Sequence, residues 1–185
     1  MDNSERIYEI CLGGIGGQGV MLMAKIMGEA LSNDGYNVLQ TQAHGIEARG
    51  GISYGEVLYG HGEINRLCVT KPDILLALSE SALSAYAGKV PENGYIFYDT
   101  YMLKDKYRDN LHKIYGAPFT EIAIKELGSA IYANLIAMGF INGITKIINP
   151  VILQGALQVC VKSNKKNNCK ALQRGYEEVK KYNAE

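Results

Sequence analysis

The stretch RIYEICLGGIGGQGVMLMAKIMGEALSNDGYNVLQTQ, residues 6–42, decides the fold. It opens with a short apolar segment over residues 6–13, which predicts a strand. This strand runs directly into a glycine-rich turn, GGIGGQG, at residues 13–19. Glycine permits backbone conformations that other residues avoid, and this turn lies directly before the expected helix.

The second half of this stretch predicts a helix and another strand. Residues 20–33 are apolar almost all round, with Lys25 and Glu29 four positions apart on one narrow stripe, so the helix should be largely covered. The segment 33–35, Asn-Asp-Gly, is a helix stop, and residues 37–42 read as a strand. A strand–turn–helix–strand unit predicts two parallel strands that pair through a right-handed crossover.

Strands and helices also alternate over the remainder of the chain. This pattern predicts the α/β class, specifically a three-layer α/β/α arrangement with a mixed, mostly parallel sheet. Expected strands cover 52–59, 63–68, 74–78, 94–99 and 112–115; expected helices cover 79–88, 118–148 (broken or bent near its glycines), 149–162 and 170–182, with a polar loop before the last.

The composition excludes several classes of protein. The 185 residues suit one domain of ordinary size. Lysine plus arginine and aspartate plus glutamate both count 19, so the formal net charge is zero. A neutral chain is a poor candidate for bulk nucleic-acid binding or for binding anionic membranes through basic patches. We therefore expect neither nucleic acid nor membrane as a partner.

The four cysteines do not form a recognisable metal motif. Cys11, Cys68, Cys160 and Cys169 include no C-x-x-C pair and have no histidine at zinc-like spacing. An iron–sulfur cluster needs several closely spaced thiolates. We expect no metal site in this chain and four reduced thiols, as in a cytoplasmic protein.

Two further segments bear on membrane insertion and location. Residues 127–145 contain no charged side chain. An uncharged segment of this length raises the question of a transmembrane helix. However, Asn134 and Asn142 lie within it, and amides are costly in hydrocarbon, so a helix buried in the protein core is the better interpretation. The N-terminal MDNSER lacks the apolar core of a signal peptide, which again favours a cytoplasmic location.

The glycine-rich turn is compatible with three kinds of function. Gly14, Gly16 and Gly19 fit the G-x-G-x-x-G pattern between a strand and a helix. The turn could be purely structural, could bind a nucleotide or a CoA-type phosphate, or could bind NAD. An NAD site needs an acidic residue at the end of the second strand, where residues 40–42 are Gln-Thr-Gln. In each case we expect that replacing Gly16 or Gly19 by a residue with a side chain would strain the turn and destabilise the protein.

A second glycine-rich segment brings an imidazole and two opposite charges together. His44, Glu47 and Arg49 fall within six residues, beside Gly50 and Gly51. The loop could contact a partner or a ligand, could be held by an internal ion pair, or could perform acid–base chemistry. Because no nucleophile or third triad member accompanies it, contact with a partner or ligand is the preferred interpretation, and we expect no catalytic residue here.

Taken together, several blocks resemble the gamma subunit of 2-oxoacid:ferredoxin oxidoreductases, most closely the 2-oxoglutarate type. The resemblance covers nearly the whole chain in the same order. It rests on GGIGGQGV at 13–20, QTQAHGIEARGGISYGEV at 40–57, ELG at 126–128, ANLIAMG at 133–139 and KALQRGY at 170–176.

The resemblance implies a single gamma-type domain over residues 1–185 that has no activity by itself. In that family, the alpha and beta subunits, with a delta subunit as a further candidate, are the partners. These partners hold thiamine diphosphate and the iron–sulfur clusters, and this chain would bind no cofactor alone. The complex converts a 2-oxoacid and CoA to an acyl-CoA and passes electrons to ferredoxin. Self-association of the isolated chain is left open.

The resemblance also implies two groups of site residues. The first is a cofactor-binding turn, and the second contacts a partner subunit or CoA. The two groups are Gly14, Gly16, Gly17, Gln18 and Gly19; and His44, Glu47, Arg49, Gly50, Gly51 and Asn134. The main alternative is a stand-alone nucleotide-binding or regulatory module, and a small NAD-dependent reductase is a weaker one.

Overall fold

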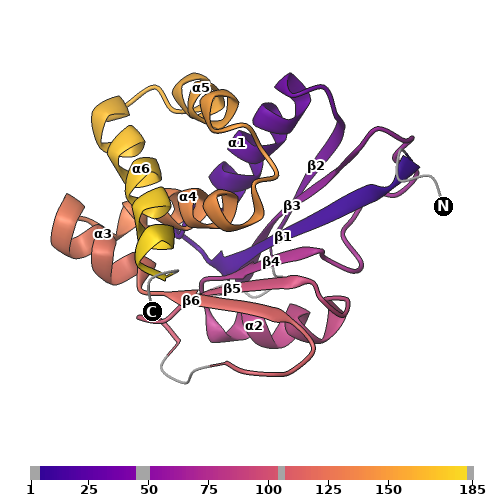
Figure 1. Ribbon diagram of the computed structural model, residues 1–185, viewed down its shortest axis with the longest axis horizontal. Helices are drawn as coiled ribbons and strands as arrows, with labels where there is room; N and C mark the ends of the chain where they lie inside the picture. The colour runs from indigo at the N-terminus through magenta and orange to yellow at the C-terminus, as the bar shows by residue number, and fades with distance from the viewer. Residues whose placement is uncertain (1–4, 45–50, 104–106, 183–185) are drawn as a thin grey trace.

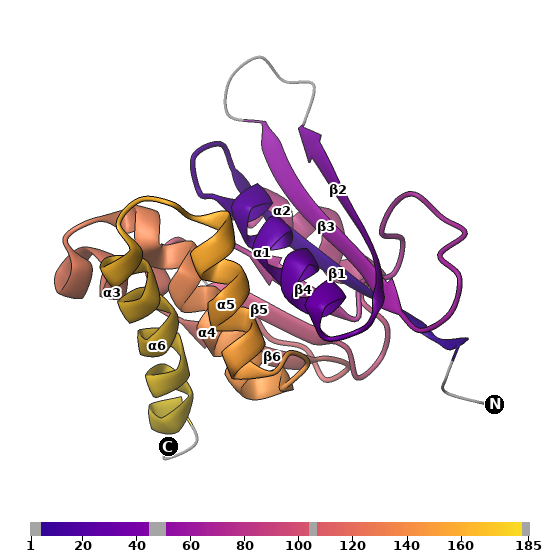
Figure 2. The same cartoon turned by 90° about the horizontal axis from the view of Figure 1, so that it is seen from above.

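The computed structural model describes residues 5–44, 51–103 and 107–182, and Figures 1 and 2 show a sheet with helices on both faces. Six strands follow the order β2-β3-β1-β4-β5-β6. The strands are β1 (Ile7–Ile15), β2 (Asn37–His44), β3 (Ile52–Gly60), β4 (Ile74–Ala77), β5 (Tyr95–Asp99) and β6 (Lys113–Ala117). The helices are α1 (Val20–Asn33), α2 (Glu80–Tyr86), α3 (Phe119–Leu127), α4 (Ala133–Thr145), α5 (Pro150–Cys160) and α6 (Lys165–Tyr182), with short 3₁₀ turns η2 (Ala87–Lys89) and η3 (Ala130–Tyr132).

The sheet is mixed and mostly parallel, as expected. β1 pairs in parallel with β4, β4 with β5, and β5 with β6. Only β3 runs against its neighbours, because it pairs antiparallel with both β1 and β2. The parallel strands therefore end together at one edge of the sheet, which we call the carboxyl edge, and begin at the opposite, amino edge.

The expected direct pairing of β1 with β2 is wrong. The two strands do run in the same direction, but β3 lies between them and pairs with both. The connection from β2 to β3 is short, so the two strands form a hairpin, and the returning strand takes the position beside β1. A strand–helix–strand connection fixes the relative direction of its two strands and the right-handedness of the crossover. It does not determine whether a later strand inserts between these two strands.

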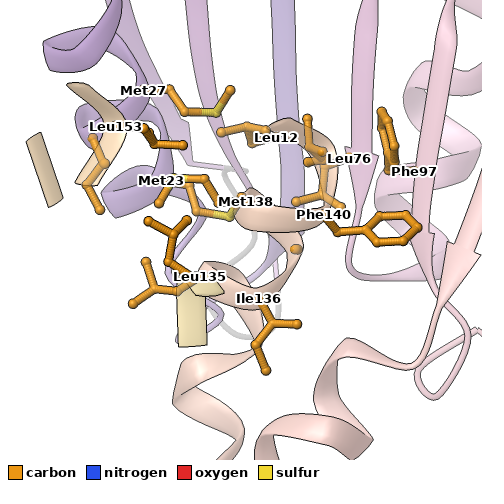
Figure 3. Close-up of a cluster of buried hydrophobic side chains, with 14 of the residues drawn as sticks. Leu12, Met23, Met27, Leu76, Phe97, Leu135, Ile136, Met138, Phe140 and Leu153 are labelled. Carbon is orange, nitrogen blue, oxygen red and sulfur yellow. The ribbon is translucent and has the colours of Figure 1, made fainter. Parts of the chain in front are cut away.

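The two faces of the sheet are covered unequally. Helices α1, α3, α4, α5 and α6 lie on one side of the sheet, where α5 packs on α1 and α6 packs on α4, while α2 lies on the other side (Figure 1). Successive side chains of each strand point to opposite faces of the sheet, so that Leu12 belongs to the larger hydrophobic core and Cys11 to the smaller one. Figure 3 shows Leu12, Leu76 and Phe97 of the sheet against Met23 of α1 and Phe140 of α4 in the larger core.

The uncharged segment forms a buried helix, as expected. In α4, every residue from 133 to 142 is buried. The helix lies so close to α6 that a Cβ on Gly139 would overlap with the carbonyl oxygen of Leu172. Asn142 satisfies its amide inside the protein, because it donates to Ile148 O (2.9 Å) and Tyr176 Oη (2.7 Å). Across the described ranges, no helix is both long enough and apolar enough for a transmembrane span.

Of three further expectations, one is confirmed, one helix begins earlier than expected, and one expected strand is absent. The helical region 118–148 divides into α3 and α4 at Gly128, whose φ of 76° ends α3, so the expected break at a glycine is confirmed. Helix α6 begins at Lys165 rather than Lys170, because Asn168 Nδ2 donates to Ser163 O (2.9 Å) and ties the first turn to the preceding loop. The strand expected over 63–68 is wrong: this segment is an irregular loop.

Candidate functional site

The glycine-rich turn lies at the carboxyl edge, between β1 and α1. Gly13 and Gly14 still belong to β1, where they pair with Tyr54 and Ser53 of β3. The chain leaves the sheet after Ile15, and α1 begins at Val20. The turn itself is therefore shorter than the sequence pattern suggested, and it comprises residues 16–19.

Only part of this turn requires glycine. Gly17 and Gly19 have φ values of 91° and 72°, in the left-handed region. A Cβ on Gly19 would also overlap with Nδ2 of Asn134, which agrees with the expectation for this glycine. For Gly16 the expectation is wrong on steric grounds, because a Cβ there would meet no atom within 4 Å.

Two side chains hold the turn from within the protein. Gln18 Oε1 accepts a hydrogen bond from Ile15 N (2.8 Å), and Gln18 Nε2 donates to the carbonyl of Leu78 at the end of β4 (3.0 Å). Asn134 is only 4% exposed and donates from Nδ2 to Gly19 O (3.3 Å). Gln18 and Asn134 thus fix the shape of the turn; Asn134 is buried, whereas Gln18 is part-buried.

The turn has one feature that suits an anion. The first N–H groups of any helix lack intrahelical acceptors, and α1 has no side-chain cap at Gly19. Such a helix start attracts a phosphate or carboxylate. The last residues of β2, Gln42, Ala43 and His44, include no acid, so the feature expected for NAD binding is absent from this position.

The β2–β3 hairpin ends beside this turn. Ile15 of β1 pairs with Ile52 at the start of β3, and His44 at the end of β2 pairs with Ser53. Figure 2 shows both strand ends at the same edge as the β1–α1 turn. The backbone thus places Gly51 next to the turn, and His44 lies on β2, one strand further from it. Glu47, Arg49 and Gly50 lie outside the described residues.

A cavity of about 230 Å³ adjoins the glycine turn on its other side. Gly17 and Gln18 form one wall, Leu78 lies at the end of β4, and Met102 and Ile131 contribute from later segments. Among the described residues that line it, none carries a charge. This cavity can therefore receive an apolar group, and it offers no cation of its own for a phosphate.

Asp99 holds in place the part of the cavity wall that Met102 and Thr120 form. This buried carboxylate, at the end of β5, accepts hydrogen bonds from Thr120 N (2.9 Å), Thr120 Oγ1 (2.6 Å) and Tyr101 N (3.0 Å). Burial raises the pKa of Asp99 and outweighs these hydrogen bonds, which lower it. Sequence reasoning missed Asp99, although an acid that ends an apolar strand is a recognisable signal.

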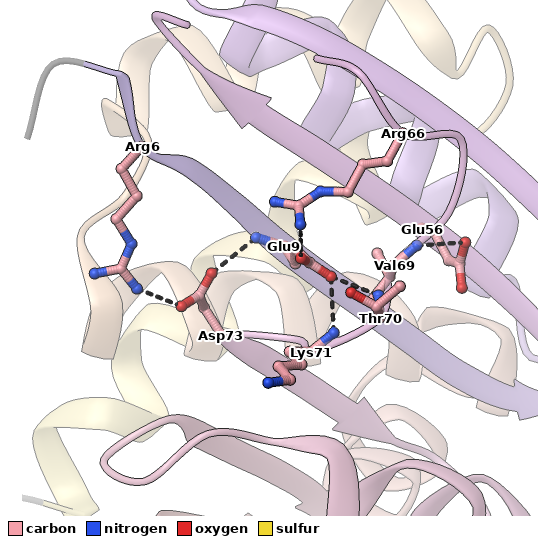
Figure 4. Close-up of polar contacts among 8 residues, drawn as sticks. All are labelled: Arg6, Glu9, Glu56, Arg66, Val69, Thr70, Lys71 and Asp73. Carbon is pink, nitrogen blue, oxygen red and sulfur yellow. Dashed lines mark hydrogen bonds and ion pairs between the residues drawn. The ribbon is translucent and has the colours of Figure 1, made fainter. Parts of the chain in front are cut away.

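A second set of acids that sequence reasoning missed lies beneath the loop 61–73, which leaves β3 at the amino edge (Figure 4). Glu9 of β1 accepts from Thr70 N (2.6 Å) and Lys71 N (2.9 Å) and pairs with Arg66 (3.0 Å). Glu56 of β3 accepts from Val69 N (3.2 Å). Both acids point to the face that has only α2, so they fasten the loop 61–73 over otherwise thinly covered strands.

The described residues contain no group of three His, Cys, Asp or Glu side chains that could hold a metal ion. Cys11 is fully buried, and burial raises the pKa of its thiol, so it is a poor nucleophile. The carboxyl edge thus offers a helix start, an apolar cavity and strand ends, without a recognisable set of catalytic side chains among the described residues.

Comparison with known sequences gives consistent matches. The model of the pyruvate ferredoxin/flavodoxin oxidoreductase family matches residues 9–178. The 2-oxoglutarate synthase subunit KorC of Methanocaldococcus jannaschii is 36% identical over 93% of this chain and 94% of its own length. The protein of the same name from Archaeoglobus fulgidus is 33% identical over 93% of this chain and 88% of its own.

Comparison with solved structures agrees. The gamma subunit of a keto/oxoacid ferredoxin oxidoreductase from Geobacter sulfurreducens matches with a TM-score of 0.84 and 30% identity, over 95% of this chain and 98% of its own. A 2-oxoglutarate:ferredoxin oxidoreductase from Magnetococcus marinus, with 2-oxoglutarate, coenzyme A and succinyl-CoA bound, matches with a TM-score of 0.81. This second match covers 96% of this chain and 32% of the longer chain at 21% identity, so it concerns the fold alone.

Proposed function

The chain belongs to the pyruvate ferredoxin/flavodoxin oxidoreductase family and is a subunit of a 2-oxoacid:ferredoxin oxidoreductase; on that premise we propose that its complex acts on 2-oxoglutarate. The observation that carries this proposal is the similarity to 2-oxoglutarate synthase subunits over nearly the full length of both chains. The complex would convert 2-oxoglutarate and CoA to succinyl-CoA and carbon dioxide, and two electrons would pass to ferredoxin.

Within this complex, the proposed role of the chain is assembly and formation of the CoA side of the site. The alpha and beta subunits would hold thiamine diphosphate and the iron–sulfur clusters. This division of labour is supported by the similarity of the chain to single subunits of multisubunit oxidoreductases. The turn at 16–19 and the β2–β3 hairpin would together approach CoA, because they lie side by side at the carboxyl edge.

Purification of the tagged chain from its native cell tests the subunit role and the substrate together. We expect two or more larger chains to copurify, and the complex to reduce ferredoxin only when 2-oxoglutarate and CoA are both present. The isolated chain should be inactive. A complex that prefers pyruvate or a branched-chain oxoacid would refute the substrate, while a monomer that binds a nucleotide would favour the stand-alone alternative.

Arg49 is the residue that we propose as the charged contact of the hairpin, because a guanidinium can hold a carboxylate or phosphate through two parallel hydrogen bonds. Arg49→Ala should weaken assembly or raise the KM for CoA, and it should leave the isolated chain's stability within about 0.5 kcal/mol. Arg108→Ala, at an exposed position before β6, is the matched control and should change neither. Loss of several degrees of Tm in Arg49→Ala, with normal kinetics, would mean that Arg49 is a structural pin.

A further inference from the structure

The β2–β3 hairpin is supported by different elements on its two faces. Strand β2 lies at the edge of the sheet, where it pairs with β3. On one face, α1 packs so closely on the hairpin that a Cβ on Gly55 would overlap with the carbonyl oxygen of Val20. On the other face, β3 presents Tyr54 and Glu56, and Tyr86 at the end of α2 contacts both of them. Support from α2 therefore reaches the hairpin through this tyrosine.

Tyr86 makes a ring contact and a hydrogen bond to β3. Its ring centroid lies 4.7 Å from that of Tyr54, with the two planes inclined by 56°. Its hydroxyl donates to Glu56 Oε1 (3.3 Å). Burial, together with nearby Cys11 and Glu56, raises the pKa of Tyr86, so the hydroxyl keeps its proton. Glu56 Oε2 in turn accepts from Thr41 Oγ1 (3.0 Å), directly across the strand pair on β2. Tyr86 thus contacts β3 directly and supports β2 through Glu56.

The helix that carries Tyr86 is itself held in place. It lies so close to β1 that a Cβ on Gly13 would overlap with the Cβ of Ala82. Ser79 caps the start of α2, because its hydroxyl accepts from Ala82 N (3.2 Å). The ammonium of Lys89 lies 4.2 Å from the centroid of the Tyr86 ring, in a cation–π contact. A ring fixed in this way can determine the position of the strands that pack against it.

The contact with Tyr54 lies close to the carboxyl-edge end of the hairpin. Tyr54 pairs with Gly13 of β1 and with Ala43 of β2, in the last pair but one at this end of the β2–β3 ladder. We propose that Tyr86 is a positioning residue, which holds this end of the hairpin at the place from which it approaches CoA. The proposal rests on the proposed function, and it adds a residue that neither predicted group contains. Tyr86 acts on the hairpin and does not itself touch CoA.

Steady-state kinetics of the complex test this role, with each variant chain coexpressed with the other subunit genes of its source. Tyr86→Leu removes the ring and the hydroxyl but keeps an apolar side chain. It should raise the KM for CoA about fivefold or more and change kcat by less than about twofold, because a displaced hairpin loses binding to CoA. Tyr86→Phe keeps the ring against Tyr54 and should restore a KM near the wild-type value.

Tyr95→Leu is the matched control. Tyr95 is also a half-buried tyrosine, but it lies at the start of β5, at the amino edge. Its replacement should lower the Tm by a similar amount and leave the KM for CoA unchanged. An equal rise of this KM in Tyr95→Leu would mean that general destabilisation is the cause, and it would overturn the role of Tyr86.

Tyr54→Leu removes the same contact from the side of the hairpin, and it tests the proposal even if Tyr86→Leu does not fold. It should raise the KM for CoA as Tyr86→Leu does. The double variant should be no worse than either single variant, because all three lack one shared contact. Effects on this KM that multiply in the double variant would overturn the proposal.

Hydrogen–deuterium exchange of the complex without CoA gives a readout that is independent of turnover. Exchange at residues 39–44 and 52–56 should be faster in Tyr86→Leu than in the wild type or in Tyr86→Phe. Unchanged exchange there, or an unchanged KM for CoA in both leucine variants of the contact, would overturn the proposal. A wild-type complex that reduces ferredoxin equally without CoA would instead refute the proposed function, while the exchange measurement would still test the hold of Tyr86 on the hairpin.

Discussion

The two edges of the sheet use polar groups for opposite purposes. Below the loop 61–73, which leaves β3 at the amino edge, the buried carboxylates of Glu9 and Glu56 accept hydrogen bonds from the loop's backbone and so hold it over the thinner face of the sheet. At the carboxyl edge, Gln18 and Asn134 fasten a turn that leaves a helix start and an apolar cavity beside it. Removal of the buried carboxylates should therefore cost the most stability, while changes to exposed side chains at the carboxyl edge should affect assembly and the KM for CoA.

Glu9→Ala should produce the largest loss of stability. It leaves two N–H groups and Arg66 without their carboxylate at a position that is 4% exposed. Removal of one partner from such a buried network costs about 2–4 kcal/mol, or on the order of 5–15 °C in Tm for a chain of this size. Thermal unfolding of the isolated chain measures this.

Glu9→Gln is the matched control for this prediction, because it keeps one acceptor oxygen and the shape of the side chain. Its loss of stability should be clearly smaller. A Glu9→Ala chain that melts like the wild type would show that the loop 61–73 does not depend on this carboxylate.

Gly19→Ala should come next. It forces a side chain into the left-handed region and against Asn134, at a cost of about 1–3 kcal/mol. Gly16→Ala should stay within about 0.5 kcal/mol, because open space surrounds that position. Chemical denaturation of the two variants gives the difference directly. Equal losses would contradict the conformation described for the turn.

The smallest expected effect is a pH dependence at His112. Burial lowers the pKa of His112, but its hydrogen bonds to Asp109 (2.7 Å) and to Val90 O (3.0 Å) raise it more, so the net pKa lies above 6.5. The charged ring therefore stabilises the fold fully below the unfolded-state pKa, and this contribution disappears as the pH rises through the higher folded-state pKa.

Unfolding free energies at about pH 5.5 and about pH 9 provide the measurement. The wild type should lose more stability over this rise than His112→Gln does. An equal change in both proteins would remove His112 as the cause.

Much of the fold could be predicted from the sequence because its signals are local. The apolar run before GGIGGQG, the stop at 33–35 and the glycines near 128 located β1, α1 and the end of α3. The insertion of β3 between β1 and β2 could not be predicted, because strand order depends on contacts between segments far apart in the chain. For the same reason, residues 63–68 were expected to form a strand, although the loop 61–73 that contains them is held by tertiary contacts with Glu9 and Glu56.

The candidate site was predictable in its position rather than in its details. The glycine pattern located the turn, yet it could not separate Gly19, which has no room for a side chain, from Gly16, which has. Asn134 drew attention as an amide in an apolar helix, but its contact with Gly19 O joins residues 115 positions apart. The cavity beside Gly17 was not foreseen, because it forms between segments that are far apart in the chain, such as those of Met102 and Ile131.

Hydrogen–deuterium exchange on the isolated chain and on the assembled complex tests the division between the two edges most directly. Assembly should slow exchange at residues 15–20, 99–103 and 128–133, which form the carboxyl edge. The loop 61–73 at the amino edge should exchange equally in both states, because the chain's own carboxylates already hold several of its amides. Protection confined to the loop 61–73, with no change around the glycine turn, would contradict the account.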